Sequence, residues 1–271
     1  MSTKVAIVTG ASSGIGEAIA RRLQGLGYVV YAAARRVDRM AHLADAGIKP
    51  VMLDVTDDAS MVGLVETVLA ESGHIDVLVN NAGYGSYGSL EEVPLDEARR
   101  QFEVNVFGLA RLTQLVLPGM RAQRSGHVVN ISSMGGKIYF PLGAWYHATK
   151  FAVEGLSNSL RMEVAPFGIQ VVVIEPGGIA TEWGGIAGEG LSAVSGQGAY
   201  APQAVQVAKL LASEGSSPEV VANAVAGAVS ARRARTRYAM GLGAKPLIFA
   251  RWLLSDRAFD RLIGFAVKSA R

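Results

Sequence analysis

Short apolar runs alternate with longer amphipathic segments along most of the chain. The runs are rich in valine and isoleucine and occupy residues 5–8, 29–34, 51–53, 77–79, 128–131 and 171–174. Short, almost wholly apolar runs are typical of strands that are buried on both faces of a sheet. Residues 14–25, 37–45, 59–71, 95–120 and 144–165 have a helical pattern. This alternation predicts an α/β fold, a doubly wound parallel β-sheet flanked by helices with right-handed crossovers.

The pattern changes after residue 181. Residues 182–217 contain many glycines among alanine, serine and glutamine, so we expect mobile backbone that forms a substrate lid. A helix at 219–230 and a strand at 237–240 should follow. Large apolar residues and arginines mix in residues 245–271, which we expect to form a C-terminal helical extension. No repeat or linker divides the sequence, so a single domain over residues 1–271 is predicted.

Composition excludes several classes of protein. Of the 271 residues, 50% are hydrophobic, enough for a sizeable core, and only 18% are charged, which suggests buried subunit contacts. A net charge of +3 suits an anionic ligand without demanding nucleic acid. The chain has no cysteine, which excludes disulfides, thiolate catalysis and cysteine-bound zinc. No apolar stretch reaches the roughly 20 residues of a spanning helix, and the start lacks a signal-peptide pattern, so we expect a soluble, cytoplasmic protein.

Histidines and clustered arginines offer little chemistry. The four histidines have no ligand spacing, so no metal site is predicted. His147 follows Tyr146 but points about 100° away on a helix, so we expect it at the surface or at the rim of a substrate site. The run Arg232, Arg233, Arg235 and Arg237 reads as a solvated face. It lacks the interleaved aromatic residues of a single-strand binder, so no nucleic-acid partner is expected.

Three glycines follow the first predicted strand and open the first helix. Gly10, Gly14 and Gly16 permit a tight turn and close backbone approach, while a helix N-terminus presents N–H groups to a pyrophosphate. Placed between a strand and a helix at the start of an α/β chain, they predict dinucleotide binding by a Rossmann-type sheet.

Tyr146 and Lys150 lie four residues apart on a predicted helix and therefore share one face. An ammonium 4 Å from a phenol would lower the phenol pKa by roughly three units, before desolvation subtracts from this effect. The pair is a plausible acid–base device.

These residues belong to a longer series of motifs. Residues 9–16, Asn80-Asn81-Ala82-Gly83, Asn105, Ser133, Tyr146 with Lys150, and Pro176-Gly177 with Thr181 resemble the successive motifs of the short-chain dehydrogenase/reductase family. The resemblance extends over residues 4–181, in the family's order and spacing. It implies an oxidoreductase acting on CH–OH groups. The C-terminal extension resembles that of steroid and retinol dehydrogenases, which suggests a bulky apolar substrate.

The resemblance implies roles for the catalytic residues. Tyr146 would be the general acid in carbonyl reduction and the base in alcohol oxidation, and Lys150 would lower its pKa and bind the nicotinamide ribose. Ser133 would hydrogen-bond the substrate oxygen. Asn105 would hold a water that links Lys150 to solvent; the alternative is a capping or packing amide. The residues expected to contact the cofactor are Gly10, Ser12, Ser13, Gly14, Ile15, Gly16, Arg35, Arg36, Asp54, Val55, Asn81, Ala82, Gly83, Tyr146, Lys150, Pro176, Gly177, Ile179 and Thr181.

Charge at the end of the second strand indicates which cofactor is bound. NAD sites of this fold usually place a carboxylate there, but this position is Ala34, followed by Arg35 and Arg36. Arginines can pair with a 2′-phosphate, so NADP(H) is predicted, with Arg35 the better candidate. The alternative is that both arginines are solvated. Asp54 resembles the family's adenine-contacting Asp, although it could cap the next helix, a role that Thr56 or Asp57 fits better.

The leading hypothesis is an NADP(H)-dependent oxidoreductase of a ketone, aldehyde or secondary alcohol. Trp145, Leu142 and Trp183 are candidates for substrate contact, and the two long helices at 95–120 and 144–165 are expected to form a homodimer or homotetramer. One rival is a dinucleotide-binding sensor with incidental catalysis. Another is a membrane-associated protein that docks through its C-terminal stretch; we expect this stretch rather to roof the substrate cleft or to pack between subunits.

Overall fold

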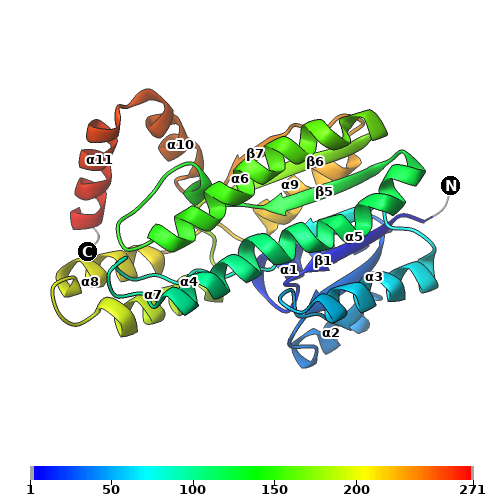
Figure 1. Cartoon of the computed structure of the whole chain (residues 1–271), viewed down its shortest axis with the longest axis horizontal. Helices are drawn as coiled ribbons and strands as arrows, with labels where there is room; N and C mark the ends of the chain where they lie inside the picture. The colour runs from blue at the N-terminus through cyan, green and yellow to red at the C-terminus, as the bar shows by residue number, and fades with distance from the viewer. Residues whose placement is uncertain (1–2, 270–271) are drawn as a thin grey trace.

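The computed structural model describes residues 3–269, which contain a seven-stranded parallel sheet of order β3-β2-β1-β4-β5-β6-β7 (Figure 1). The strands are β1 (Val5–Thr9), β2 (Val29–Ala34), β3 (Lys49–Met52), β4 (Val77–Asn80), β5 (Gly126–Ile131), β6 (Ile169–Pro176) and β7 (Arg237–Met240). The predicted doubly wound α/β fold is confirmed. Since every pair is parallel, all carboxyl ends of the strands meet at one edge of the sheet, where ligands of such folds bind.

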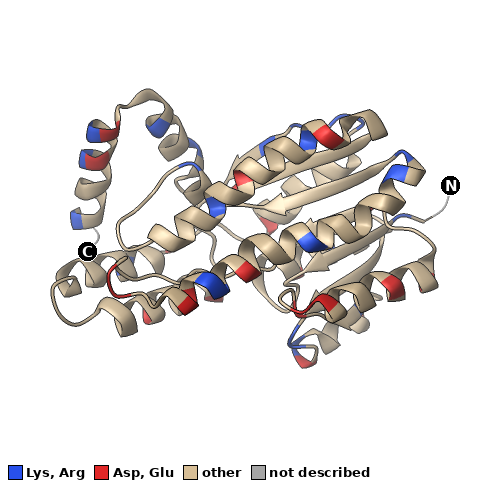
Figure 2. Cartoon of the chain, in the orientation of Figure 1, with Lys and Arg blue, Asp and Glu red and all other residues tan. Residues whose placement is uncertain are grey.

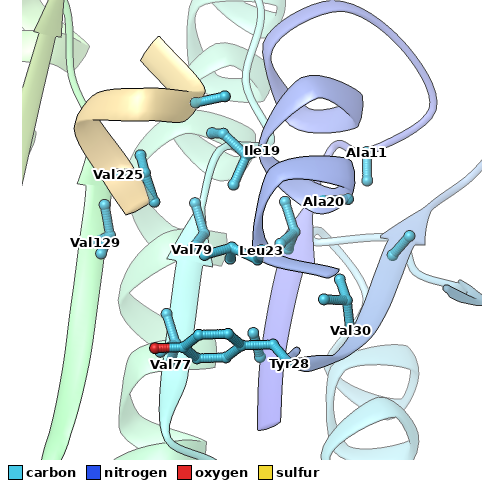
Figure 3. Packing of buried hydrophobic residues seen from close by; sticks show 14 of the residues in the cluster. Ala11, Ile19, Ala20, Leu23, Tyr28, Val30, Val77, Val79, Val129 and Val225 are labelled. Carbon is cyan, nitrogen blue, oxygen red and sulfur yellow. The ribbon is translucent and has the colours of Figure 1, made fainter. Parts of the chain in front are cut away.

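Helices cover both faces of the sheet. One face carries α1 (Gly14–Gln24), α2 (Ala41–Ala44) and α9 (Glu219–Ser230), and the other carries α3 (Asp58–Ser72), α5 (Gly108–Gln123) and α6 (Ala144–Val164). Figure 3 shows the first face, where Ile19 and Leu23 of α1 meet Val225 of α9 above β4 and β5. These side chains are fully buried, and each such burial stabilises the fold by about 1.5–3 kcal/mol.

The predicted helix over residues 95–120 contains a change of hydrogen-bond register. It begins as α4 (Leu95–Phe102), passes through a π-helical turn η2 (Glu103–Phe107) and continues as α5. Single π turns inside α-helices occur frequently at functional sites. This turn carries Asn105.

The predicted glycine-rich lid is regular in structure. Residues 182–217 contain two helices, α7 (Glu182–Ser195) and α8 (Ala201–Leu211), where the sequence suggested irregular backbone. Two of the glycines in α7 serve close packing, because a Cβ at Gly188 would touch Ala208 and one at Gly184 would overlap the Leu211 carbonyl. The composition therefore reflects a tight pair of helices.

The predicted C-terminal helices are present as α10 (Ala244–Leu253) and α11 (Asp256–Ser269). They form an arm beside α8, at the end of the molecule away from the N-terminus (Figure 1). Short 3₁₀ turns are η1 (Asp38–Met40), η3 (Met134–Gly136) and η4 (Ala165–Phe167). Within residues 3–269, no helix combines the length and the apolar character needed to span a bilayer.

Candidate active site

The glycine loop after β1 packs tightly against the loop after β4. Gly10 and Gly14 have φ angles of +65° and +57°, which favour glycine. A Cβ at Gly10 would lie 2.9 Å from the Ala82 Cα, so side chains are excluded there. Thr9 Oγ1 accepts hydrogen bonds from the backbone N–H groups of Asn81 (3.0 Å) and Ala82 (2.9 Å). Gly83 completes this second loop, where a Cβ would lie 3.1 Å from Asn105 Oδ1.

The N-terminus of α1 is suited to an anion. Ser13 occupies the N-cap position, but its side chain makes no capping hydrogen bond. The N–H groups of the first turn, which includes Ile15 and Gly16, therefore remain available to a phosphate. Thr181, at the N-terminus of α7, lies across the loop, since a Cβ at Gly14 would come within 3.0 Å of its Cγ2. Glycine backbone and an uncapped helix fit the pyrophosphate of a dinucleotide.

Charged residues gather at the end of β2. Ala34 closes the strand, and Arg35 and Arg36 are exposed after it. Arg36 lies 3.5 Å from Ser12 Oγ, while Arg35 forms no ion pair within the described residues. A hydrogen bond from the Thr56 backbone and the charge of Arg35 lower the pKa of Asp54.

Asp54 does not cap α3. Asp57 does so, accepting from the Ala59 N–H at 3.1 Å, as the sequence favoured. Val55 is buried beside Asp54. At the end of β6, Pro176 closes the strand, the Gly177 N–H donates to the Met240 carbonyl at 2.8 Å, and Ile179 packs against the core on the α1 side of the sheet.

Tyr146 and Lys150 both lie buried on the inner face of α6. Burial raises the pKa of Tyr146 to about 12, although a hydrogen bond with Ser133 opposes the shift. Burial also lowers the pKa of Lys150 to about 8. Lys150 Nζ donates to the Ile131 carbonyl at 3.0 Å and lies 5.9 Å from the centre of the Tyr146 ring. The lowered phenol pKa expected from the pair is therefore wrong for the protein by itself, because burial raises the pKa and only the hydrogen bond with Ser133 opposes that rise.

Ser133 follows β5 and faces Tyr146. Its Oγ accepts from the Gly135 N–H at 3.0 Å, so its own O–H is the group that can donate toward the phenol oxygen. Ser132 points the other way: a Cβ at Gly136 would lie 2.7 Å from Ser132 Oγ. The alternation along the strand end thus brings Ser133, and not its neighbour, to the phenol.

Asn105 joins three segments of the site. Its Oδ1 accepts from the Tyr84 N–H at 3.0 Å, and its Nδ2 donates to the Tyr84 carbonyl (2.9 Å) and to Thr149 Oγ1 (3.1 Å). These bonds use both amide N–H groups and one of the two acceptor positions of Oδ1, so the side chain holds the loop after β4 and α6 together. The packing role that the sequence left open is therefore present, and the expected water beside Lys150 stays a prediction.

Aromatic rings that the motifs do not include enclose Tyr146. The Tyr87 ring lies 5.4 Å from it, centre to centre, and the Trp183 ring lies 5.3 Å from it. Tyr87 is 4% exposed and lies in the loop after β4. Its only signal in the sequence was an aromatic residue among glycines. Leu142 is buried in the same cluster, and its carbonyl accepts from the Gly88 N–H at 2.8 Å. These groups form one apolar wall.

Two expectations for the neighbours of Tyr146 are wrong. His147 is 5% exposed, where we expected a surface or rim position. Its Nδ1 bonds the Gly135 carbonyl (3.0 Å) and its Nε2 accepts from the Phe140 N–H (2.9 Å), so it secures the loop after Ser133. Trp145 packs edge-on against Phe102 of α4, away from Tyr146. His147 and Trp145 are each one residue from Tyr146, and this step of about 100° around the helix points their side chains away from the Tyr146 hydroxyl.

A buried ionic cluster lies behind the catalytic residues. Glu154, one turn after Lys150, pairs with Lys137 at 2.9 Å and with Arg237 at 3.1 Å. Arg237 also pairs with Glu175 of β6 at 3.2 Å. Both carboxylate side chains are nearly inaccessible, and burial together with the charge of Glu154 raises the pKa of Glu175 to about 7. Arg237 is thus partly buried and paired with interior carboxylates, so the expected solvated face is wrong for it; Arg232, Arg233 and Arg235 are exposed as predicted.

A groove of about 660 Å³ opens beside this wall. Its lining comes from the loops before α4 and α6 and from α8, namely Ser89, Leu90, Glu91, Phe140, Pro141, Leu142, Ala144, Tyr200 and Gln203. Leu142 belongs both to the groove and to the cluster around Tyr146, so the groove adjoins that cluster. Within residues 3–269, no group of acidic residues and histidines could hold a metal ion.

Known proteins resemble this chain over most of its length. Residues 4–189 match the family profile described as short chain dehydrogenase. The chain is 41% identical to an oxidoreductase, BOA17, of Botryotinia fuckeliana over 187 residues, 68% of each protein. It is 39% identical over 181 residues to a 3-ketodihydrosphingosine reductase of Bacteroides thetaiotaomicron, covering 67% of this chain and 66% of that protein.

Solved structures extend the likeness to the whole chain. A short-chain dehydrogenase from Streptomyces avermitilis is 38% identical, with a TM-score of 0.83 over 99% of this chain and 98% of that one. A serine dehydrogenase complexed with NADP+ is 30% identical (TM-score 0.76, 88% and 94% covered). A Burkholderia phymatum relative in complex with NAD is 26% identical (TM-score 0.80, 96% and 95% covered). Related proteins thus bind either dinucleotide.

Proposed function

The chain belongs to the short-chain dehydrogenase family, an oxidoreductase family with NAD(P)-dependent hydride transfer, and we propose that this member uses NADP(H) on a bulky apolar ketone, aldehyde or secondary alcohol. The observation that carries the proposal is the convergence of Ser133, Tyr146 and Lys150 beside the glycine loop, under an aromatic wall.

The site residues have distinct tasks in this reaction. The bound nicotinamide would supply the hydride for reduction or accept it in oxidation. Tyr146 donates its proton to the carbonyl oxygen, and the high pKa that burial imposes keeps it protonated at neutral pH. The O–H of Ser133, which points toward the phenol in the protein alone, would donate to the same oxygen and stabilise the charge that develops there. Lys150, held by the Ile131 carbonyl, adds positive charge beside the phenol.

The preference for NADP(H) rests on charge. Ala34 leaves the end of β2 without a carboxylate, and Arg35 and Arg36 stand exposed just after it. Arg36 is already oriented toward Ser12 of the glycine loop. A 2′-phosphate would find two guanidinium groups there and no repelling carboxylate on the strand end.

The apolar character of the wall favours a bulky apolar substrate. Tyr87, Trp183 and Leu142 surround the phenol, and the groove beside them is wide enough for a molecule of drug size. A relative named as a 3-ketodihydrosphingosine reductase agrees with a ketone substrate.

Assembly as a homodimer or homotetramer forms part of the proposal. Large apolar side chains are exposed along α4, the π turn and α6, with Leu95 at 58%, Phe107 at 55% and Met162 at 76%. A shallow apolar hollow of about 290 Å³ lies on the same surface, beside Trp145. Burial of this surface between copies would remove it from water. The proposed location stays cytoplasmic, in line with the absence of cysteine.

NADPH consumption across a panel of ketones and aldehydes tests the proposal. We expect turnover with bulky apolar carbonyls, and a Tyr146→Phe variant that loses about 10²-fold or more of kcat while it still binds NADPH. If the wild-type protein binds NADPH but turns over no member of the panel, the catalytic proposal fails and the sensor hypothesis takes its place.

A further inference from the structure

The C-terminal arm has two chemically different sides. On α11, Phe259, Ile263 and Val267 recur every four residues and are 0–3% exposed. They pack in the cluster that contains Tyr87 and Tyr146. This inner side of α11 is thus part of the apolar cluster around Tyr146.

The outer side of the arm exposes large apolar groups. On α10, Phe249, Trp252 and Leu253 are 59%, 77% and 64% exposed, and the first two rings lie 5.8 Å apart. On α11, Phe265 is 71% exposed, because it lies two residues, and thus about 160° around the helix, from the buried Ile263. Packing within the protein does not cover these groups.

Cations accompany the exposed rings. Arg257 and Arg261 are displaced from the buried face of α11 in the same way as Phe265, and Lys268 also points outward. Together with Lys245 of α10, they form no ion pair within the described part of the chain. The acidic residues of the arm have other partners: Asp256 pairs with Arg251 of α10 at 2.6 Å, and Asp260 accepts from the Tyr139 hydroxyl at 3.0 Å. Figure 2 shows these charges on the arm.

We propose that the outer side of α10 and α11 docks on the surface of a lipid bilayer that carries anionic headgroups. Trp and Phe side chains enter the headgroup boundary, while Lys and Arg bind the anionic lipids. The charge also argues against a symmetric contact with a second copy. Such an interface would place the patch against itself and bring cations of like sign together.

Docking would bring the substrate groove close to the bilayer. The same helices roof the apolar cluster from inside and present rings to the outside. An apolar molecule dissolved in the membrane would then have a short route to the groove. The docking itself does not rest on the identity of the substrate or cofactor.

Flotation of the full-length protein with vesicles tests the proposal. We compare vesicles of phosphatidylcholine alone with vesicles containing about 30% phosphatidylserine, at low and high salt. Binding should require the anionic lipid, weaken in high salt and shift the fluorescence of Trp252 to shorter wavelength.

Two variants and a matched control sharpen the test. Each cation near an anionic surface adds about fivefold to affinity, so Arg257→Glu with Arg261→Glu should weaken binding at least tenfold. Trp252→Ser with Phe265→Ser should weaken it similarly. Arg232→Glu with Arg233→Glu carries the same change of net charge at an exposed site elsewhere and should bind like wild type.

An unchanged circular dichroism spectrum and unfolding temperature confirm that each variant is folded. Equal binding by the arm variants and the control would overturn the proposal. So would partitioning that is independent of phosphatidylserine. A third outcome would assign the surface to a second copy instead. In that case the wild-type protein does not bind vesicles, and light scattering shows that the arm variants have a different oligomeric state.

Discussion

Replacement of Glu175 by glutamine should stabilise the protein at alkaline pH. Glu175 lies in the interior with Glu154, Arg237 and Lys137, and its side chain is 4% exposed. Burial and the nearby charge of Glu154 raise its pKa from 4.5 to about 7. The folded protein therefore keeps a proton that the unfolded chain releases between these values. Stability falls as pH rises through this window and levels off above about pH 7.

The size of the effect follows from the two pKa values. The difference between a pKa of 4.5 and one of about 7 corresponds to about 3 kcal/mol of unfolding free energy. This value is an upper bound, because Glu175 interacts with the charge of Glu154. Glutamine has nearly the shape of the protonated acid and never ionises. Near pH 5 the Glu175→Gln variant should match wild type, and near pH 8 it should be more stable by about 2–3 kcal/mol, or several degrees in Tm.

Denaturant unfolding at pH 5 and pH 8, at one protein concentration, measures the difference. Glu163→Gln is the matched control, since Glu163 is exposed on α6 and should change neither value. Should Glu175→Gln be less stable than wild type at pH 8, the attraction of Arg237 for an ionised Glu175 exceeds the cost of burial. A difference that is the same at both pH values would likewise refute the reasoning.

Three further predictions concern the reaction. Arg35→Ala should raise the KM for NADPH at least tenfold and leave the KM for NADH nearly unchanged, while the exposed control Arg22→Ala should change neither KM. An equal rise in both KM values would show that Arg35 does not bind the 2′-phosphate. Trp183→Ala should raise the KM for bulky apolar ketones more than for small ones, since Trp183 packs 5.3 Å from the Tyr146 ring, and a uniform fall in kcat would contradict a role in substrate contact. Because Tyr146 has a pKa of about 12, alcohol oxidation should accelerate about tenfold per pH unit between pH 6 and 8, while carbonyl reduction stays flat; parallel profiles would assign proton transfer to another group.

The strands of the sheet could be predicted because each strand has its own short apolar pattern in the sequence. Strands buried on both faces need short apolar runs, and the runs at 5–8, 77–79 and 171–174 mark β1, β4 and β6 directly. The glycine loop was predictable for a similar reason, since the positive φ angle of Gly10 is tied to residue type. In both cases the cause lies within a few residues of its effect.

Other features depend on partners far away in sequence. Composition alone suggested a loop for residues 182–217, yet Gly188 serves the approach of α8. His147 seemed exposed because nothing near it in sequence reveals the loop from Gly135 to Phe140 that it binds. Glu154 and Arg237 are 83 residues apart, so their pairing has no local signal. The π turn at Asn105 changes the hydrogen-bond register of the helix, and the hydrophobic periodicity of the sequence does not reveal that change.

Burial also affects the protonation of Tyr146 and Lys150. Desolvation penalises charge, so it raises the pKa of Tyr146 to about 12 and lowers that of Lys150 to about 8. Both shifts favour neutral forms, and a neutral phenol can donate a proton but cannot accept one. Reduction of a carbonyl needs the form that predominates at neutral pH, whereas oxidation needs a phenolate that the apolar wall of Tyr87 and Trp183 disfavours. The aromatic enclosure that keeps the phenol protonated therefore fits the proposed role of Tyr146 as the proton donor in carbonyl reduction.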